Sequence, residues 1–152
     1  MQPDLSAASH PPAAAPTRRG VVIVVREAER FLVIRRSEFV VAPRKHCFPG
    51  GHIEAGESEE EAVIREFREE LGGHVLPQEP LWKSVSPRGV QLSWWSANLA
   101  EASQPLKPDP AEVEAAFWCS PAEMTALPEL LDSNRTFLEY VLAGTIRWRA
   151  SP

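Results

Sequence analysis

Acidic side chains are concentrated in one short part of the sequence. Eight of the twenty-one Asp and Glu residues fall between positions 54 and 70. Carboxylates held close together repel each other unless a cation neutralises them, and Mg²⁺ is commonly shared between a few carboxylates and substrate phosphates. The pattern therefore points first to metal-assisted chemistry on a phosphorylated substrate. The eight residues are Glu54, Glu57, Glu59, Glu60, Glu61, Glu66, Glu69 and Glu70.

Most of these glutamates fall on a predicted helix. A capping-box pattern starts at Ser58, and no proline or glycine interrupts the chain until Gly72, which predicts a helix between them. At 100° per residue, the carboxylates of Glu66, Glu69 and Glu70 share one face of that helix. A glutamate-rich helix is more often a solvated face than a site. The flanking residues must therefore decide between the two interpretations.

The segment before the helix favours a site. Residues 48–51 are Phe-Pro-Gly-Gly, and the two glycines let the backbone approach a ligand closely and offer it a carbonyl oxygen. Ala62 is small and on the acidic face, which leaves room for a ligand. Arg65, one turn before Glu69, can orient a carboxylate through its planar guanidinium group.

The spacing of these residues resembles the Nudix box. That motif consists of Gly, five residues, Glu, seven residues, Arg-Glu, an apolar residue, any residue, Glu-Glu, any residue, Gly and an apolar residue. The sequence departs from it at Gly73, where an aliphatic residue is usual, and this departure removes no ligand. The matching positions are Gly51, Glu57, Arg65, Glu66, Phe67, Glu69, Glu70 and Gly72.

The resemblance implies a fold and a reaction. The fold is of the α/β class, an α/β/α sandwich with a central mixed sheet, and the reaction is hydrolysis of a phosphoanhydride bond by water attacking phosphorus. By matching position, Glu66, Glu69 and Glu70 would coordinate Mg²⁺ or Mn²⁺ together with the carbonyl of Gly50.

Further roles follow from the same resemblance. Glu57 and Arg65 would brace the loop of the box against its helix. The general base would be Glu69, or a glutamate in a downstream loop, for which Glu112 is the best candidate. A plain surface glutamate is the alternative for Glu112.

Three residues outside the glutamate-rich segment are predicted to bind substrate: Arg36, Phe48 and Asn134. Arg36 and Asn134 match nucleotide-contacting positions of mutator-type members. A surface charge explains Arg36 equally well, and a helix N-cap is the simpler explanation for Asn134. The substrate favoured is a (d)NTP, cleaved by a pyrophosphohydrolase. The alternatives are a pyrophosphatase of ADP-ribose or another nucleoside-diphosphate sugar, and a noncatalytic nucleotide-sensing Nudix module.

These residues must be positioned by a set of predicted strands, helices and loops. Trp94 and Trp95 are adjacent on a predicted strand and face opposite sides, so they are not expected to face the core together. Core packing is the default for either, and stacking on a base or on a packed helix is the alternative for one of them. Strands are expected at 21–25, 31–34, 81–85, 90–99 and 115–119, loops at 37–52 and 104–110, and further helices from Ser120 and over 134–142.

Bulk properties set the remaining expectations. With 152 residues, we expect a flexible Ala/Pro-rich tail at 1–19 and one Nudix domain at 20–152. The formal charge of −5 argues for a small-molecule nucleotide as partner and against a nucleic acid polymer. The longest apolar run, Val21–Val25, is too short to cross a membrane. Cys47 and Cys119 lack metal-ligand spacing, which fits a reducing cytoplasm. A homodimer is left open.

Overall fold

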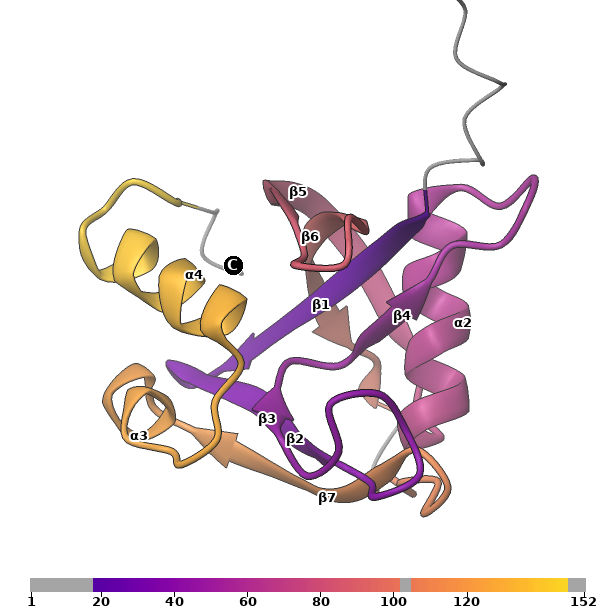
Figure 1. The fold of residues 1–152 in the computed structure, drawn as a ribbon, viewed down its shortest axis with the longest axis horizontal. Helices are drawn as coiled ribbons and strands as arrows, with labels where there is room; N and C mark the ends of the chain where they lie inside the picture. Colours follow the sequence, from indigo (N-terminus) through magenta and orange to yellow (C-terminus); the bar gives the residue numbers. More distant parts are fainter. Residues whose placement is uncertain (1–17, 102–104, 148–152) are drawn as a thin grey trace, which may run out of the picture.

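The computed structural model describes residues 18–101 and 105–147, so most of the expected tail lies outside the described part of the chain. Seven strands in this part form one mixed sheet. One face of the sheet carries helix α2 (Glu59–Leu71), and the other carries α3 (Pro121–Thr125) and α4 (Asp132–Leu142) (Figure 1). The predicted α/β/α sandwich is confirmed.

Strand β1 is the centre of the sheet because it has partners on both sides. It pairs in parallel with β6, and its start pairs antiparallel with β4 while its end pairs antiparallel with β2. Strand β2 continues the sheet to β3 and β7, and β5 lies beyond β6. The bounds are β1 Arg19–Glu27, β2 Arg30–Arg36, β3 His46–Cys47, β4 Gly50–His52, β5 Val75–Val85, β6 Gln91–Leu99 and β7 Val113–Cys119.

Helix α2 begins and ends as the sequence predicts. The Ser58 hydroxyl accepts a hydrogen bond from the backbone N–H of Glu61, and the Glu61 carboxylate accepts one from the N–H of Ser58, which completes the capping box. Gly72 takes a left-handed conformation (φ 68°) at the other end. That conformation favours glycine because other side chains clash with the backbone there. The capping signals therefore fix both ends of the helix.

The expectation that Trp94 and Trp95 do not both face the core is wrong. Trp94 is fully buried on the α4 side, stacked on Phe137 with ring centroids 4.9 Å apart. Trp95 is buried on the α2 side, and its indole N–H donates a hydrogen bond to Glu59. Because helices cover both faces of the sheet, opposite faces lead to two cores rather than to one core and solvent.

Other differences concern the ends of elements. Strand β5 starts at Val75, well before the predicted start at position 81. The strand can include Pro77 and Pro80 because both lie beside register shifts in its pairing with β6. The expected loop at 37–52 contains the short strands β3 and β4. In the described residues, no helix is long and apolar enough to span a membrane.

The cap at Ser58 gives a stability prediction. Ser58→Ala removes the acceptor for the Glu61 N–H and is expected to lower the free energy of unfolding by about 1 kcal/mol. Ser58→Asp keeps an acceptor and is expected to stay close to wild type. Urea unfolding followed by circular dichroism measures both, and an unchanged Ser58→Ala variant would contradict the role of this cap.

Candidate metal and nucleotide site

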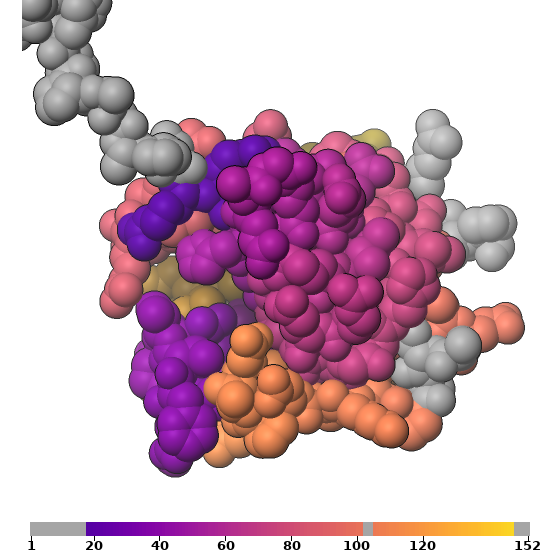
Figure 2. All heavy atoms as spheres, turned by 90° about the vertical axis from the view of Figure 1, so that its right-hand side faces the viewer, coloured from indigo at the N-terminus to yellow at the C-terminus, as the bar shows by residue number. Residues whose placement is uncertain are grey.

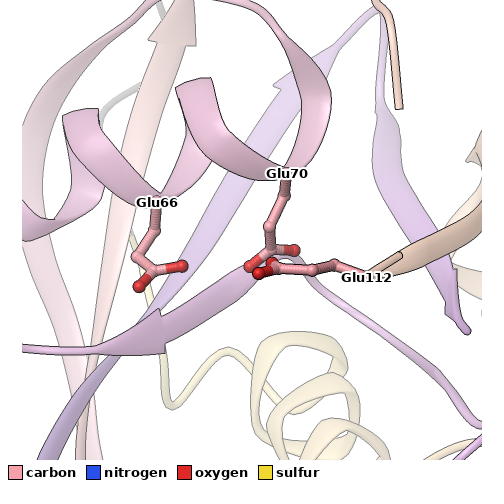
Figure 3. Close-up of side chains that lie close together, drawn as sticks. All are labelled: Glu66, Glu70 and Glu112. Carbon is pink, nitrogen blue, oxygen red and sulfur yellow. The ribbon is translucent and has the colours of Figure 1, made fainter. Parts of the chain in front are cut away.

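Three carboxylates from two separate segments meet beside β4. Glu66 and Glu70 lie one turn apart on α2, and Glu112 reaches them from the loop before β7 (Figure 3). Each of the three offers an oxygen within 4.8 Å of the others. Oxygen ligands of this kind suit hard divalent cations such as Mg²⁺ and Mn²⁺.

The environment of this group disfavours negative charge in the absence of a cation. Glu70 is 4% exposed and Glu66 is 9% exposed. Burial raises the pKa of Glu70 well above its ordinary value, the charge of Glu66 raises it further, and the hydrogen bond from the Gly50 N–H lowers it. Burial also raises the pKa of Glu66, against the lowering effect of Arg65. A bound cation would relieve both effects.

The two glycines of β4 bring the backbone against these carboxylates. Gly50 donates its N–H to Glu70 Oε1 at 3.2 Å. A side chain at Gly51 would overlap the Glu66 carboxylate, whereas one at Gly50 would collide with the backbone carbonyl of Val21. Glycine at position 51 therefore leaves room for the Glu66 carboxylate, and glycine at position 50 allows β4 to pair with β1.

Arg65 holds the box together through all three guanidinium nitrogens. Nε and Nη2 form a two-pronged ion pair with Glu57 at 2.7 and 2.9 Å, and Nη2 also donates to the carbonyl of His52. This contact lowers the pKa of Glu57 to about 2, so Glu57 is ionised at neutral pH. Nη1 donates to Glu66 and Glu69 at 2.9 and 3.1 Å. The expected brace between loop and helix is present in this geometry.

Glu69 is the most exposed of the three glutamates predicted to bind metal. Its side chain is 49% exposed and pairs with Arg65, and it is not among the residues that line the adjoining cavity. Arg65 Nη1 joins its carboxylate to that of Glu66, whereas the group of oxygens within 4.8 Å of one another consists of Glu66, Glu70 and Glu112. The role of Glu69 as a metal ligand stays a prediction.

The adjoining cavity has a volume of about 600 Å³, within the usual range for ligand sites. In Figure 2 it is the hollow beside α2, between the start of β1 and the loop after β2. Its lining is mainly apolar, with a few charged and amide groups. The residues used below are Arg36, Phe39, Val41, Cys47, Phe48, Gly50, Gly51, Glu66, Glu70, Glu112 and Asn134.

All three predicted substrate-binding residues line this cavity. The Asn134 Oδ1 accepts the backbone N–H of Phe48 at 2.9 Å, so Asn134 ties α4 to the loop before β4. It is not a helix N-cap, because α4 begins earlier and Leu131 occupies that position without a side-chain cap. The Arg36 Nε donates to the carbonyl of Val41 at 2.7 Å, so Arg36 supports the cavity wall rather than pointing freely into solvent.

Sequence patterns did not indicate three further residues that line the cavity, Phe39, Val41 and Cys47. Phe39 and Val41 line the cavity on a loop although they are 75% and 55% exposed, and apolar residues on a loop give no periodic pattern. Cys47 lines the floor of the cavity, and burial raises the pKa of its thiol to about 11, so it stays protonated. Such positions become recognisable only when the cavity itself is known.

The fold and the carboxylate site define a member of the Nudix class. The family model described as NUDIX domain matches residues 16–141, and the chain therefore belongs to this family. The chain is 29% identical over 125 residues to the NAD-capped RNA hydrolase NudC of Stutzerimonas stutzeri, covering 81% of this chain and 44% of that protein. It is 31% identical over 154 residues to the human m7GpppN-mRNA hydrolase NUDT17, covering 83% and 46%.

Other similarities extend this picture. The 8-oxo-dGTP diphosphatase of Escherichia coli K12 is 36% identical over 80 residues, covering 49% of this chain and 60% of that protein. The MutT protein from Methanosarcina mazei superposes with a TM-score of 0.73 at 23% identity, covering 88% and 99%, which supports the fold. The chain spans about half the length of the first curated relatives that it matches.

The two glycines of β4 give a matched pair of predictions. Gly51→Ala displaces the flexible Glu66 carboxylate and is expected to weaken Mn²⁺ binding by roughly 10- to 100-fold, with little change in stability. Gly50→Ala meets backbone and is expected to lower the free energy of unfolding by about 1–3 kcal/mol. Calorimetric titration and urea unfolding measure the two effects. Unchanged metal affinity in Gly51→Ala would contradict the assigned role of that glycine.

Proposed function

We propose that this chain is a divalent-metal-dependent hydrolase that cleaves a phosphoanhydride bond in a nucleotide. The observation that carries the proposal is the meeting of Glu66, Glu70 and Glu112 within 4.8 Å at the wall of a cavity of nucleotide size. Family membership supports the reaction class, because the named relatives are hydrolases and a diphosphatase that act on nucleotide-type groups.

The carboxylate group fits Mg²⁺ or Mn²⁺. It supplies hard oxygen donors from two segments, and two of its members are buried where uncompensated charge is unfavourable. When bound, such a cation neutralises the diphosphate and lowers the pKa of an attacking water. We assign Glu112 to this metal site because it lies with Glu66 and Glu70.

Glu69 is then the remaining candidate for the general base. Its carboxylate is held by Arg65 on the exposed side of α2, so its side chain must rotate before it can accept a proton from water in the cavity. Arg65 keeps its pair with Glu57 during such a rotation, because that pair uses Nε and Nη2 rather than Nη1. The brace and the base would thus act independently.

For the substrate we propose a (d)NTP first. The cavity offers apolar walls for a base and sugar, and Arg36 and the amide of Asn134 are polar groups within that lining. The similarity to an 8-oxo-dGTP diphosphatase supports this choice. ADP-ribose or another nucleoside-diphosphate sugar is the second candidate. Relatives named as hydrolases of capped RNA also make an RNA 5′ end a substrate to test, against the prediction from net charge.

Glutamine substitutions at Glu69 and Glu70 distinguish a metal ligand from an adjacent glutamate that does not bind the metal. Glu70→Gln is expected to lower kcat by about 10²- to 10³-fold, the scale for losing one group that stabilises transition-state charge. Glu69→Gln, which removes the proposed base, is also expected to lower kcat, but it is expected to leave Mn²⁺ affinity close to that of the wild type, whereas Glu70→Gln weakens Mn²⁺ binding. Steady-state kinetics with Mg²⁺ and calorimetric titration with Mn²⁺ measure the two effects, and a loss of Mn²⁺ affinity in Glu69→Gln equal to that in Glu70→Gln would place Glu69 in the ligand set.

The same Glu70→Gln variant reports on folding. Without metal, its melting temperature is expected to match or exceed that of the wild type, since the amide keeps the oxygen that accepts the Gly50 N–H and removes a buried like charge. With Mn²⁺ added, only the wild type is expected to gain stability. A gain in melting temperature with Mn²⁺ equal to that of the wild type would remove Glu70 from the ligand set.

A substrate panel tests the reaction itself. We expect phosphate release from (d)NTPs with Mg²⁺ and a coupled inorganic pyrophosphatase, and none with EDTA. ADP-ribose, a nucleoside-diphosphate sugar and a short capped RNA, each followed by chromatography of the products, form the other arms. Preferential cleavage of one of these three substrates would replace the (d)NTP assignment. Inactivity on the whole panel would contradict the proposed hydrolase activity.

A further inference from the structure

The carboxylate of Glu112 is held in the metal site by a loop rather than by α2. The carbonyls at the end of α2 receive backbone N–H groups from that loop, Lys107 N to Leu71 O at 2.7 Å and Asp109 N to Glu70 O at 2.9 Å. These bonds fix the start of the loop. Within the loop, Asp109 accepts the backbone N–H groups of Ala111, Glu112 and Val113, and a further attachment comes from outside the loop.

Ser37 provides this further attachment. It is 3% exposed and follows β2, whose pairing with β7 shifts in register between Arg35 and Arg36. Such a bulge redirects the chain at a strand end. The Ser37 N–H donates to the carbonyl of Glu112 at 3.0 Å, and its hydroxyl donates to the carbonyl of Ala111 at 2.7 Å.

The same hydroxyl has a partner on the cavity side. Ser37 Oγ accepts the backbone N–H of Phe39 at 3.2 Å, at the start of the loop whose residues 39–42 line the cavity. One buried hydroxyl therefore joins the loop that carries Glu112 to the loop that forms the substrate wall. A buried hydroxyl with both its donor and its acceptor used holds one arrangement of the two loops.

We propose that Ser37 is a positioning residue that holds Glu112 within the group of metal-binding carboxylates. The inference rests on the proposed function, because it takes Glu112 as a metal ligand. Ser37 touches neither metal nor substrate and acts through Glu112. Loss of the Ser37 hydroxyl leaves the Ala111 carbonyl and the Phe39 N–H without this partner. The hydrogen bond from the Ser37 N–H to the Glu112 carbonyl stays. We therefore expect the fold to survive and the Glu112 carboxylate to be less well placed.

A double-mutant cycle tests this role without any substrate. Mn²⁺ affinity is measured by titration calorimetry for the wild type, Ser37→Ala, Glu112→Gln and the double variant. Ser37→Ala is expected to weaken Mn²⁺ binding about three- to tenfold, the scale of one uncharged hydrogen bond. In the Glu112→Gln background the same change is expected to have no further effect, because a positioning residue cannot act through a ligand that is already lost.

Ser96 is the matched control. It is also a buried serine, and its hydroxyl likewise joins two segments, donating to the carbonyl of Glu79 and accepting its N–H, away from the carboxylates. Ser96→Ala is expected to leave Mn²⁺ affinity unchanged in both backgrounds. A loss in Ser96→Ala as large as that in Ser37→Ala would show a general effect of a buried serine and overturn the proposal.

The remaining outcomes separate the inference from the function on which it rests. Unchanged Mn²⁺ affinity in Ser37→Ala, or an equal loss with and without Glu112, overturns the role of Ser37 while leaving the metal site in place. Unchanged affinity in Glu112→Gln removes Glu112 from the ligand set, and the role of Ser37 with it. No Mn²⁺ binding by the wild type overturns the proposed function itself.

Discussion

Repulsion between three carboxylates is the constraint on which the rest of this structure depends. Glu66, Glu70 and Glu112 lie within 4.8 Å of one another, and two of them are buried. Such a group is unfavourable on its own, so the surrounding structure must hold it in place until a cation arrives. Arg65 supplies one positive charge at Glu66, and the Gly50 N–H supplies a hydrogen bond at Glu70.

The two walls of the cavity are built in different ways. Helix α2 packs on β1 and β4, and its apolar face is part of the core. Strand β1 changes partner from β4 to β2 along its length, and the strands that separate at this point border the cavity. Glu66 and Glu70 are thus placed by the packing of α2, while loop residues such as Phe39 and Val41 line another part of the cavity.

Sequence reasoning succeeded where the determinants are local. The capping box at Ser58, the uninterrupted run to Gly72 and the Arg65 brace all depend on residues within one turn or one loop of each other. It failed where the determinants come from distant segments. The burial of both Trp94 and Trp95 depends on α4 as well as α2, and the bond from Phe48 to Asn134 joins positions 86 residues apart.

The case of Glu69 and Glu112 shows why a single helix cannot define a metal site. A helical wheel gives the direction of each side chain about the axis but not the place of the cavity, and of the three glutamates on that helix face only Glu66 and Glu70 line the cavity. A cation needs oxygens on several sides, whereas one helix face offers them from one side only. A ligand from a second segment would therefore be required, and Glu112 is placed to supply it. Since its loop is tied to Ser37, and Ser37 to Phe39, the positions of the proposed metal ligand and of the cavity wall depend on the same hydrogen bonds.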